Sequence, residues 1–153
     1  MFETIVWATD GSELADRALE EVRQLAEVHR SRIVAVHANQ VLTGRAAGAP
    51  VLADEPDLRL TIKEQVKELR DAGFDASLKI LSGHEQVATL IERAAETVDA
   101  DLIVVGTHGR RGVSAALMGS VALGLCHGSH RPVLVVPPTA AVERPREPEF
   151  ATA

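Results

Sequence analysis

Short apolar runs recur along the chain, and each is bounded by turn residues such as glycine, proline, aspartate or serine. Runs of this length that are rich in valine, isoleucine and leucine are typical of buried β-strands. We therefore expect five strands. The expected strands are Thr4–Ala8, Arg32–Ala38, Phe74–Leu81, Asp101–Val105 and Pro132–Pro137.

The segments between the expected strands carry apolar residues every three or four positions, which is the period of an amphipathic helix. The first helix starts near Ser12, whose side chain suits an N-cap, and the second is ended by Gly73. The four expected helices start near Ser12, cover Asp57–Ala72, follow the turn Ser82–Glu85 as far as about Val98, and cover Ser120–Gly128.

Strands that alternate with helices predict right-handed crossovers and a single doubly wound α/β domain with a mostly parallel sheet. Two long connections interrupt this alternation, Asn39–Pro56 and the glycine-rich Gly106–Gly119. The patterned domain is expected to cover residues 1–138. Residues 139–153 have no periodic pattern, so we expect them to form a disordered tail.

Composition narrows the function classes. The 153 residues suffice for one domain, and aromatic residues make up only 3%, so the core must be aliphatic. A formal net charge of -6 disfavours nucleic acid as a partner, because phosphate backbones need a basic face. The single cysteine, Cys126, and the absence of a signal-like start or a long apolar run predict a cytoplasmic protein outside membranes.

Candidate ligand-binding residues are expected just after the strands, because open parallel sheets bind ligands beyond the carboxyl ends of their strands. Ala8–Ser12 follows the first expected strand, and Gly106–Gly112 follows the fourth and continues to Gly119-Ser120. Glycine lets main-chain amides approach a ligand closely, and a helix start adds partial positive charge, so this pattern suits a phosphate group. The alternative is that these glycines serve only tight turns.

The pattern Gly106-x2-Gly109-x9-Gly119-Ser120 resembles the ATP-binding signature of the universal stress proteins. The stretch Ala8–Ser12 is similar to the end of that family's first strand, and Arg131–Pro137 to its last strand. The resemblance extends from about Thr4 to Pro137. It implies a five-stranded parallel sheet in the order 3-2-1-4-5, with two helices on each face, and a homodimer joined through the last strand, Val133–Val136.

The resemblance also implies a nucleotide site. Asp10 would lie near adenine and ribose, and a main-chain position at Val36 would face the adenine. The remaining expected binding residues lie at the end of the first strand, in the glycine loop and at the start of the last helix. They are Ala8, Gly106, His108, Gly109, Arg110, Gly119, Ser120 and Val121.

Simpler interpretations stay open at single residues. Asp10 could merely cap the first helix, and Arg110 and Arg111 could be a solvated loop tip. His108 has no evident partners for catalysis. The Cys126-His127-x2-His130 run offers too few spaced ligands for zinc.

The sequence thus predicts an ATP-binding regulatory or sensing module, with Mg²⁺ bridging phosphate oxygens, no metal site of its own and no catalytic residues. The alternatives are a slow ATP hydrolase, or a dimeric interaction module that binds cyclic AMP, another nucleotide or none.

Overall fold

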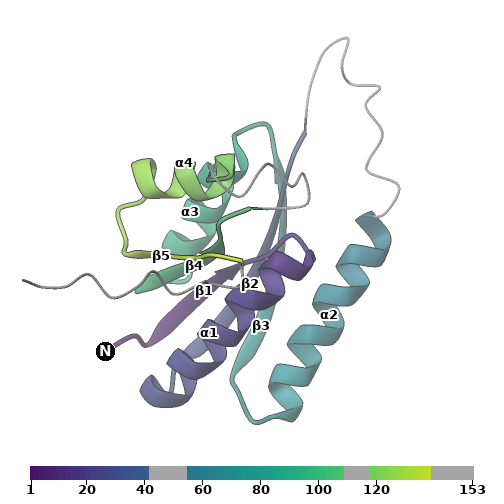
Figure 1. Cartoon of the computed structure of the whole chain (residues 1–153), viewed down its shortest axis with the longest axis vertical. Coiled ribbons are helices and arrows are strands. Elements are labelled where there is room, and N and C mark those ends of the chain that lie inside the picture. Colours follow the sequence, from purple (N-terminus) through teal and green to yellow (C-terminus); the bar gives the residue numbers. More distant parts are fainter. Residues whose placement is uncertain (42–54, 109–117, 139–153) are drawn as a thin grey trace, which may run out of the picture.

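The computed structural model describes residues 1–41, 55–108 and 118–138 of the chain (Figure 1). Its strands and helices alternate, as the sequence predicts. They are β1 (Thr4–Ala8), α1 (Glu13–His29), β2 (Arg32–Gln40), α2 (Glu55–Asp71), β3 (Ala76–Gly83), α3 (Val87–Thr97), β4 (Leu102–Gly106), α4 (Ser120–Gly128) and β5 (Val133–Val136).

The five-stranded sheet is parallel throughout and has the order β3-β2-β1-β4-β5. Helices α1 and α2 cover one face of the sheet, and α3 and α4 cover the other (Figure 1). The predicted doubly wound α/β fold and its strand order are therefore confirmed. None of the described helices is long and apolar enough to cross a membrane.

Strand β1 shows why the central strands have uninterrupted apolar sequences. Ile5 and Trp7 pack on the side of α1 and α2, whereas Val6 and Ala8 pack on the side of α3 and α4. A central parallel strand is covered on both faces and so needs apolar residues at every position. Each large apolar side chain buried in this way contributes about 1.5–3 kcal/mol to folding.

Trp7 fastens the first strand to the first helix. Its side chain is 0% exposed, and its indole N–H donates a hydrogen bond of 3.2 Å to the carbonyl of Ala15. The start of α1 is thereby held against the carboxyl end of β1, which fixes the turn between them.

The predicted bounds of β1 and α4 are confirmed. The second strand is longer than predicted, because β2 continues its pairing with β3 through Asn39 and Gln40. The expected loop Asn39–Pro56 is therefore wrong at its start, and also at its end, where α2 includes Glu55 and Pro56. Proline is well tolerated in the first turn of a helix, which explains the earlier start.

The third strand is displaced relative to the prediction. β3 starts at Ala76, and Phe74 instead packs against the core from the preceding turn. Ser82 and Gly83, expected in a turn, form the last ladder positions of the strand. Residues 42–54, 109–117 and the tail 139–153 lie outside the described residues, so the expectations for them stay predictions.

Candidate functional site

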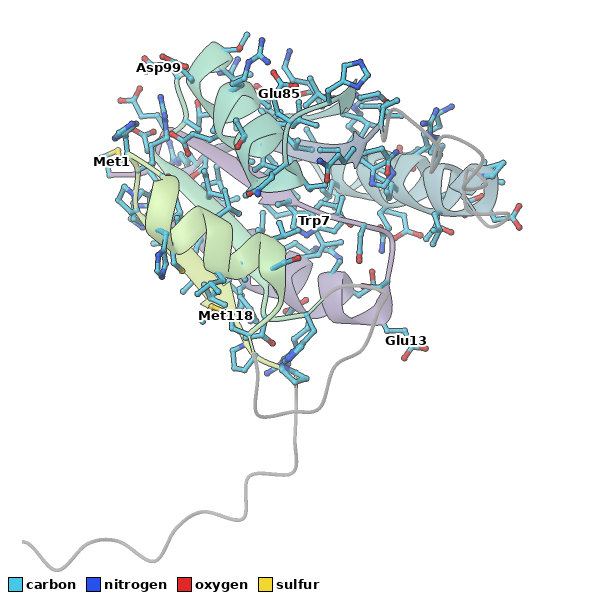
Figure 2. The ribbon with its side chains drawn as sticks, turned by 90° about the horizontal axis from the view of Figure 1, so that it is seen from above. Met1, Trp7, Glu13, Glu85, Asp99 and Met118 are labelled. Carbon is cyan, nitrogen blue, oxygen red and sulfur yellow. The ribbon has the colours of Figure 1, made fainter. Side chains whose placement is uncertain are left out.

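The site predicted from the sequence lies at the carboxyl edge of the sheet, between β1 and β4. β1 continues into α1 on one face, whereas β4 is reached through α3 on the other, so the winding of the sheet reverses between these two strands. Figure 2 shows Glu13 and Met118, next to the starts of α1 and α4, on the side of the molecule away from Met1 and Asp99.

Polar groups of the turn after β1 form hydrogen bonds within the turn and to β2. The Thr9 N–H donates to the Val36 carbonyl at 3.0 Å, and the Thr9 hydroxyl oxygen accepts from the Gly11 N–H at 3.1 Å. Asp10 accepts hydrogen bonds at Oδ1 from both the N–H and the hydroxyl of Ser12. The N-cap of α1 is Ser12, so the simpler interpretation of Asp10 as the cap is wrong. Asp10 instead orders the turn before the helix and is half-buried at the edge of the sheet.

Ser12 then starts α1. It is the N-cap of the helix and its side chain accepts from the Ala15 N–H, with Glu13 and Asp16 as acidic residues in the first turn. Gly11 has a φ of 75°, a left-handed conformation, and a Cβ there would lie 3.0 Å from Leu58 of α2. Glycine at this position therefore lets both the turn and the second helix pack closely.

Ala8, the last residue of β1, pairs with Val36 in the middle of β2. Both side chains are buried and belong to the cluster under α3 and α4. The Val36 carbonyl already accepts the Thr9 N–H. The adenine contact expected from the main chain of Val36 stays a prediction.

His37 is a residue of this edge that the sequence analysis missed. It is 1% exposed. Its Nδ1 lies 3.0 Å from the Thr9 carbonyl and its Nε2 lies 3.2 Å from the Asn39 side-chain nitrogen. In the sequence, the feature that could have revealed His37 is that it is a lone polar residue near the end of the predicted apolar strand.

The ends of the β4–α4 connection are closed against each other. Thr107 donates its N–H to the Val136 carbonyl of β5, and its own carbonyl accepts the Gly119 N–H. A Cβ on Gly119 would lie 2.9 Å from that same carbonyl oxygen. Only glycine therefore fits at the N-cap of α4 without a shift of the backbone.

The start of α4 differs chemically from that of α1. Its N-cap, Gly119, supplies no side-chain hydrogen bond, and its first turn holds no acidic residue. Ser120 is exposed, and Val121 is half-buried against the cluster under α3 and α4. The first-turn N–H groups of this helix have no side-chain cap, which is the arrangement that suits an anion.

His108 lies beside this helix start. It is 9% exposed, and its Cα is 3.4 Å from the position of a Cβ on Gly119. Its Nδ1 is 3.0 Å from the Thr107 hydroxyl oxygen. Its Nε2 is buried and has no hydrogen-bond partner in the described part of the chain.

The structure therefore brings together eight of the predicted residues, around the ends of β1 and β4, the adjoining position of β2 and the start of α4. They are Ala8, Asp10, Val36, Gly106, His108, Gly119, Ser120 and Val121. Gly109 and Arg110 lie outside the described residues, as does Arg111. The described residues include no group of three His, Cys, Asp or Glu side chains that could hold a metal ion.

Comparisons with known proteins agree with this architecture. The model of the universal stress protein family matches residues 1–137. Universal stress protein MJ0577 of Methanocaldococcus jannaschii is 28% identical over 158 residues, which cover 89% of this chain and 95% of that protein. A solved structure of MJ0577 aligns with a TM-score of 0.69, covering 90% of this chain and 97% of its own.

Two further structures share the fold. A universal stress protein from Archaeoglobus fulgidus, solved in complex with dAMP, is 23% identical with a TM-score of 0.65, covering 89% of this chain and 98% of its own. Another universal stress protein, solved in complex with cAMP, is 24% identical with a TM-score of 0.65, covering 88% and 96%.

The family model covers every described strand and helix, and the alignment with MJ0577 covers most of both proteins. The chain belongs to the universal stress protein family.

Proposed function

We propose that this protein binds ATP at the carboxyl edge of its sheet, between β1 and β4, and acts as a regulatory or sensing module in a stress response. The observation that carries the proposal is the start of α4. It combines an N-cap without a side-chain hydrogen bond, a first turn without acidic residues and a buried histidine nitrogen without a partner in the described residues.

An uncapped helix start would not be enough by itself. Helix α3 also starts without a capping side chain, at Gln86, and has no acidic residue in its first turn. However, the carboxylate of Glu85 directly precedes that N-cap, and no histidine nitrogen without a partner lies beside the start of α3 among the described residues. The combination at α4 therefore favours a phosphate group there.

The proposed pose follows the resemblance in sequence. Asp10 would contact the ribose, and the main chain near Ala8 and Val36 would face the adenine. Phosphates would contact the first turn of α4 at Gly119, Ser120 and Val121, together with Gly106 and His108 and with Gly109 and Arg110 of the undescribed segment. Main-chain amides at a helix start are suited to hold phosphate oxygens.

Adenine nucleotides are supported as the ligand class by the two proteins of this fold that were solved with dAMP and cAMP. The choice of ATP rests on the glycine spacing from Gly106 to Ser120. Mg²⁺ fits this site as an ion held by phosphate oxygens and water, because it commonly keeps several waters and needs few protein ligands. The Ser120 hydroxyl, which is exposed, is the side chain suited to assist it.

We also propose a cytoplasmic homodimer joined through β5. This strand is an edge of the sheet and pairs only with β4 in the described residues. Its Leu134 side chain is 37% exposed. An edge strand with an exposed apolar residue is suited to pair with a second copy, and the mass of the protein in solution tests this.

Titration calorimetry with Mg-ATP tests the nucleotide proposal. We expect saturable binding by the wild type and binding weakened by about tenfold in Asp10→Asn, which loses a charged acceptor. Asp75→Asn is the matched control, because Asp75 is exposed in the turn before β3, at the opposite edge of the sheet. Equal affinities for the two variants, or no binding by the wild type, would contradict the proposal.

Cyclic AMP is the second candidate ligand, because a protein with this fold was solved with it. A cyclic phosphate carries one negative charge and cannot extend a polyphosphate along the start of α4. We therefore expect ATP to displace cyclic AMP, and tighter binding of cyclic AMP would reverse the assignment. ATP recovered unchanged after long incubation would support a sensing role over hydrolysis.

A further inference from the structure

Strand β3 forms the edge of the sheet opposite β5 (Figure 1). It has 8 residues, whereas β5 has 4. Its pairing with β2 runs without a break from Ala76 to Gly83, and the strand contains no proline. Edge strands are usually kept short or interrupted by proline or a bulge, which prevents pairing with other chains. Strand β3 has none of these protections.

The main-chain groups of β3 alternate between β2 and the free edge. The Ile33 N–H donates to the Asp75 carbonyl at 2.8 Å, and the Val41 N–H donates to the Gly83 carbonyl at 2.6 Å. The odd-numbered residues of this segment therefore face β2. Because the direction alternates along a strand, the even-numbered residues face away from the sheet.

Only the beginning of this free edge is closed by the chain itself. There, Nε of Arg70 donates a hydrogen bond of 2.6 Å to the Ala76 carbonyl. The outward N–H and carbonyl groups of Leu78, Ile80 and Ser82 have no strand beside them among the described residues. The Ile80 side chain, at the middle of this stretch, is 38% exposed. The open part of the edge thus combines main-chain donors and acceptors with an apolar side chain.

A groove lies beside the same edge, between β3 and α3. Its volume is about 240 Å³, and its walls include Lys79 and Leu81 of β3 together with Leu90 and Ala94 of α3. Leu90 and Ala94 are buried, whereas Leu81 is only half-buried. A strand added to β3 would place alternate side chains on this face of the sheet, where they would meet apolar walls.

Lys79 gives the groove its unbalanced charge. The two other charged residues that line it, Arg93 and Glu85, form an ion pair with each other. The half-buried Lys79 has no ion pair within the described part of the chain. A second copy would not supply a carboxylate, because two β3 strands paired antiparallel about Ile80 would place both Lys79 side chains on one face, where like charges repel. An acidic partner is therefore favoured.

We propose that β3 is the docking edge for an extended acidic peptide segment of a partner protein, which pairs with β3 as an additional strand. In antiparallel pairing, the segment carries a carboxylate opposite Lys79 and apolar side chains opposite Ile80 and Leu81. Main-chain hydrogen bonds provide affinity, and the side chains select the partner. The inference does not depend on nucleotide binding, because none of the residues assigned to the nucleotide lies in β3.

A charge exchange between peptide and protein tests this pairing. The probe is a short capped peptide, Thr-Thr-Val-Ile-Glu-Val-Thr, whose Glu lies opposite Lys79 when its last residue lies opposite Ser77. A second peptide has Lys in place of Glu. Both are titrated into the wild type, Lys79→Glu and Lys63→Glu. Lys63→Glu is the matched control, because it makes the same charge change at an exposed position of α2.

We expect the wild type to bind the Glu peptide, and Lys79→Glu to bind it about 5- to 30-fold more weakly, because a cross-strand attraction becomes a repulsion. Lys79→Glu should instead prefer the Lys peptide, and Lys63→Glu should match the wild type. An equal loss in Lys63→Glu would overturn the inference. Binding of neither peptide by the wild type would also overturn it, and would leave Lys79 as a guard against pairing.

Proline at position 80 tests the main-chain pairing. The Ile80 N–H faces outward, so Ile80→Pro removes a donor from the free edge without removing a hydrogen bond to β2. This variant should lose peptide binding, whereas Ile80→Thr, which keeps the N–H, should retain most of it. Equal binding by the two folded variants would contradict pairing along β3.

Hydrogen exchange on the wild type gives a readout that needs no variant to fold. The Glu peptide should slow exchange at the outward amides of Leu78, Ile80 and Ser82, and should leave those of Lys79 and Leu81 unchanged, because these already face β2. Protection confined to other elements, or an equal change at all five amides, would show that the peptide does not add a strand here.

Discussion

The two helices that start beside the candidate site meet the same physical requirement in opposite ways. Each begins with N–H groups that have no partner inside the helix. In α1 the Ser12 side chain accepts the Ala15 N–H, and Glu13 and Asp16 place negative charge in the first turn. In α4 the N-cap is Gly119, and the first turn contains no acidic side chain.

This difference separates a helix start that already carries negative charge from one that does not. The turn before α1 already carries negative charge at its helix start, so a phosphate there would meet repulsion. The start of α4 carries no acidic side chain, and its N-cap Gly119 packs its main chain against the Thr107 carbonyl. At one sheet edge, the protein thus has one helix start with a side-chain cap and one without, and the second is where we propose that the phosphates bind.

The largest expected effect comes from filling the space at Gly119. In Gly119→Ala, the new methyl group would lie 2.9 Å from the Thr107 carbonyl oxygen. Backbone atoms must move to admit it, which should lower the free energy of unfolding by about 1–3 kcal/mol and abolish measurable ATP binding. Denaturant unfolding and calorimetry measure the two effects.

Gly128→Ala is the control for that substitution, because nothing lies within 4 Å of a Cβ at the last residue of α4. Its free energy of unfolding should equal that of the wild type or exceed it by up to about 1 kcal/mol, because alanine favours the helix. Equal stabilities of the two alanine variants would show that the Gly119 contact does not constrain the chain.

A smaller effect should separate the two serines at the helix starts. Ser12→Ala removes the N-cap of α1 and should cost about 1 kcal/mol of unfolding free energy. Ser120→Ala removes no capping hydrogen bond and should leave stability unchanged while weakening ATP binding. A comparable loss of stability in both variants would remove the distinction between the two helices.

The smallest effect on stability should have the opposite sign to the effect on binding. Ser120→Glu places a carboxylate in the first turn of α4, as Glu13 does in α1. Interaction with the helix dipole should raise the unfolding free energy by about 0.3–1 kcal/mol, while repulsion should weaken ATP binding. Ser120→Gln is the uncharged control, and a Ser120→Glu variant that binds ATP normally would place the phosphates elsewhere.

Much of the fold was predictable, because buried parallel strands and amphipathic helices leave strong patterns. The bounds of β1 and α4 needed only an apolar run or a glycine–serine start. The ends of β2 and β3 were missed because Asn39 and Ser82 are polar, and their pairing in the sheet is a main-chain pairing. Such pairing depends on the neighbouring strand and leaves no mark in local sequence.

The candidate site was predictable in position but not in detail. The glycines and Asp10 follow strands, so topology alone brings them to one edge. The role of His37 could not be predicted, because its ring contacts the carbonyl of Thr9 in the turn after the adjacent strand, which local sequence does not reveal. Nor could the unpartnered nitrogen of His108, since the sequence does not say which polar atoms lack partners.

The hydrogen bond from Gly119 to Thr107 has a consequence for how this fold can diversify. It joins the two ends of the intervening segment, and Thr107 is joined in turn to β5. An insertion between these two joined ends would therefore not need to move the sheet or α4, and doubling the length of a connection costs only about 0.6 kcal/mol of closure entropy. Insertions at this point offer a way to alter ligand choice on an unchanged frame.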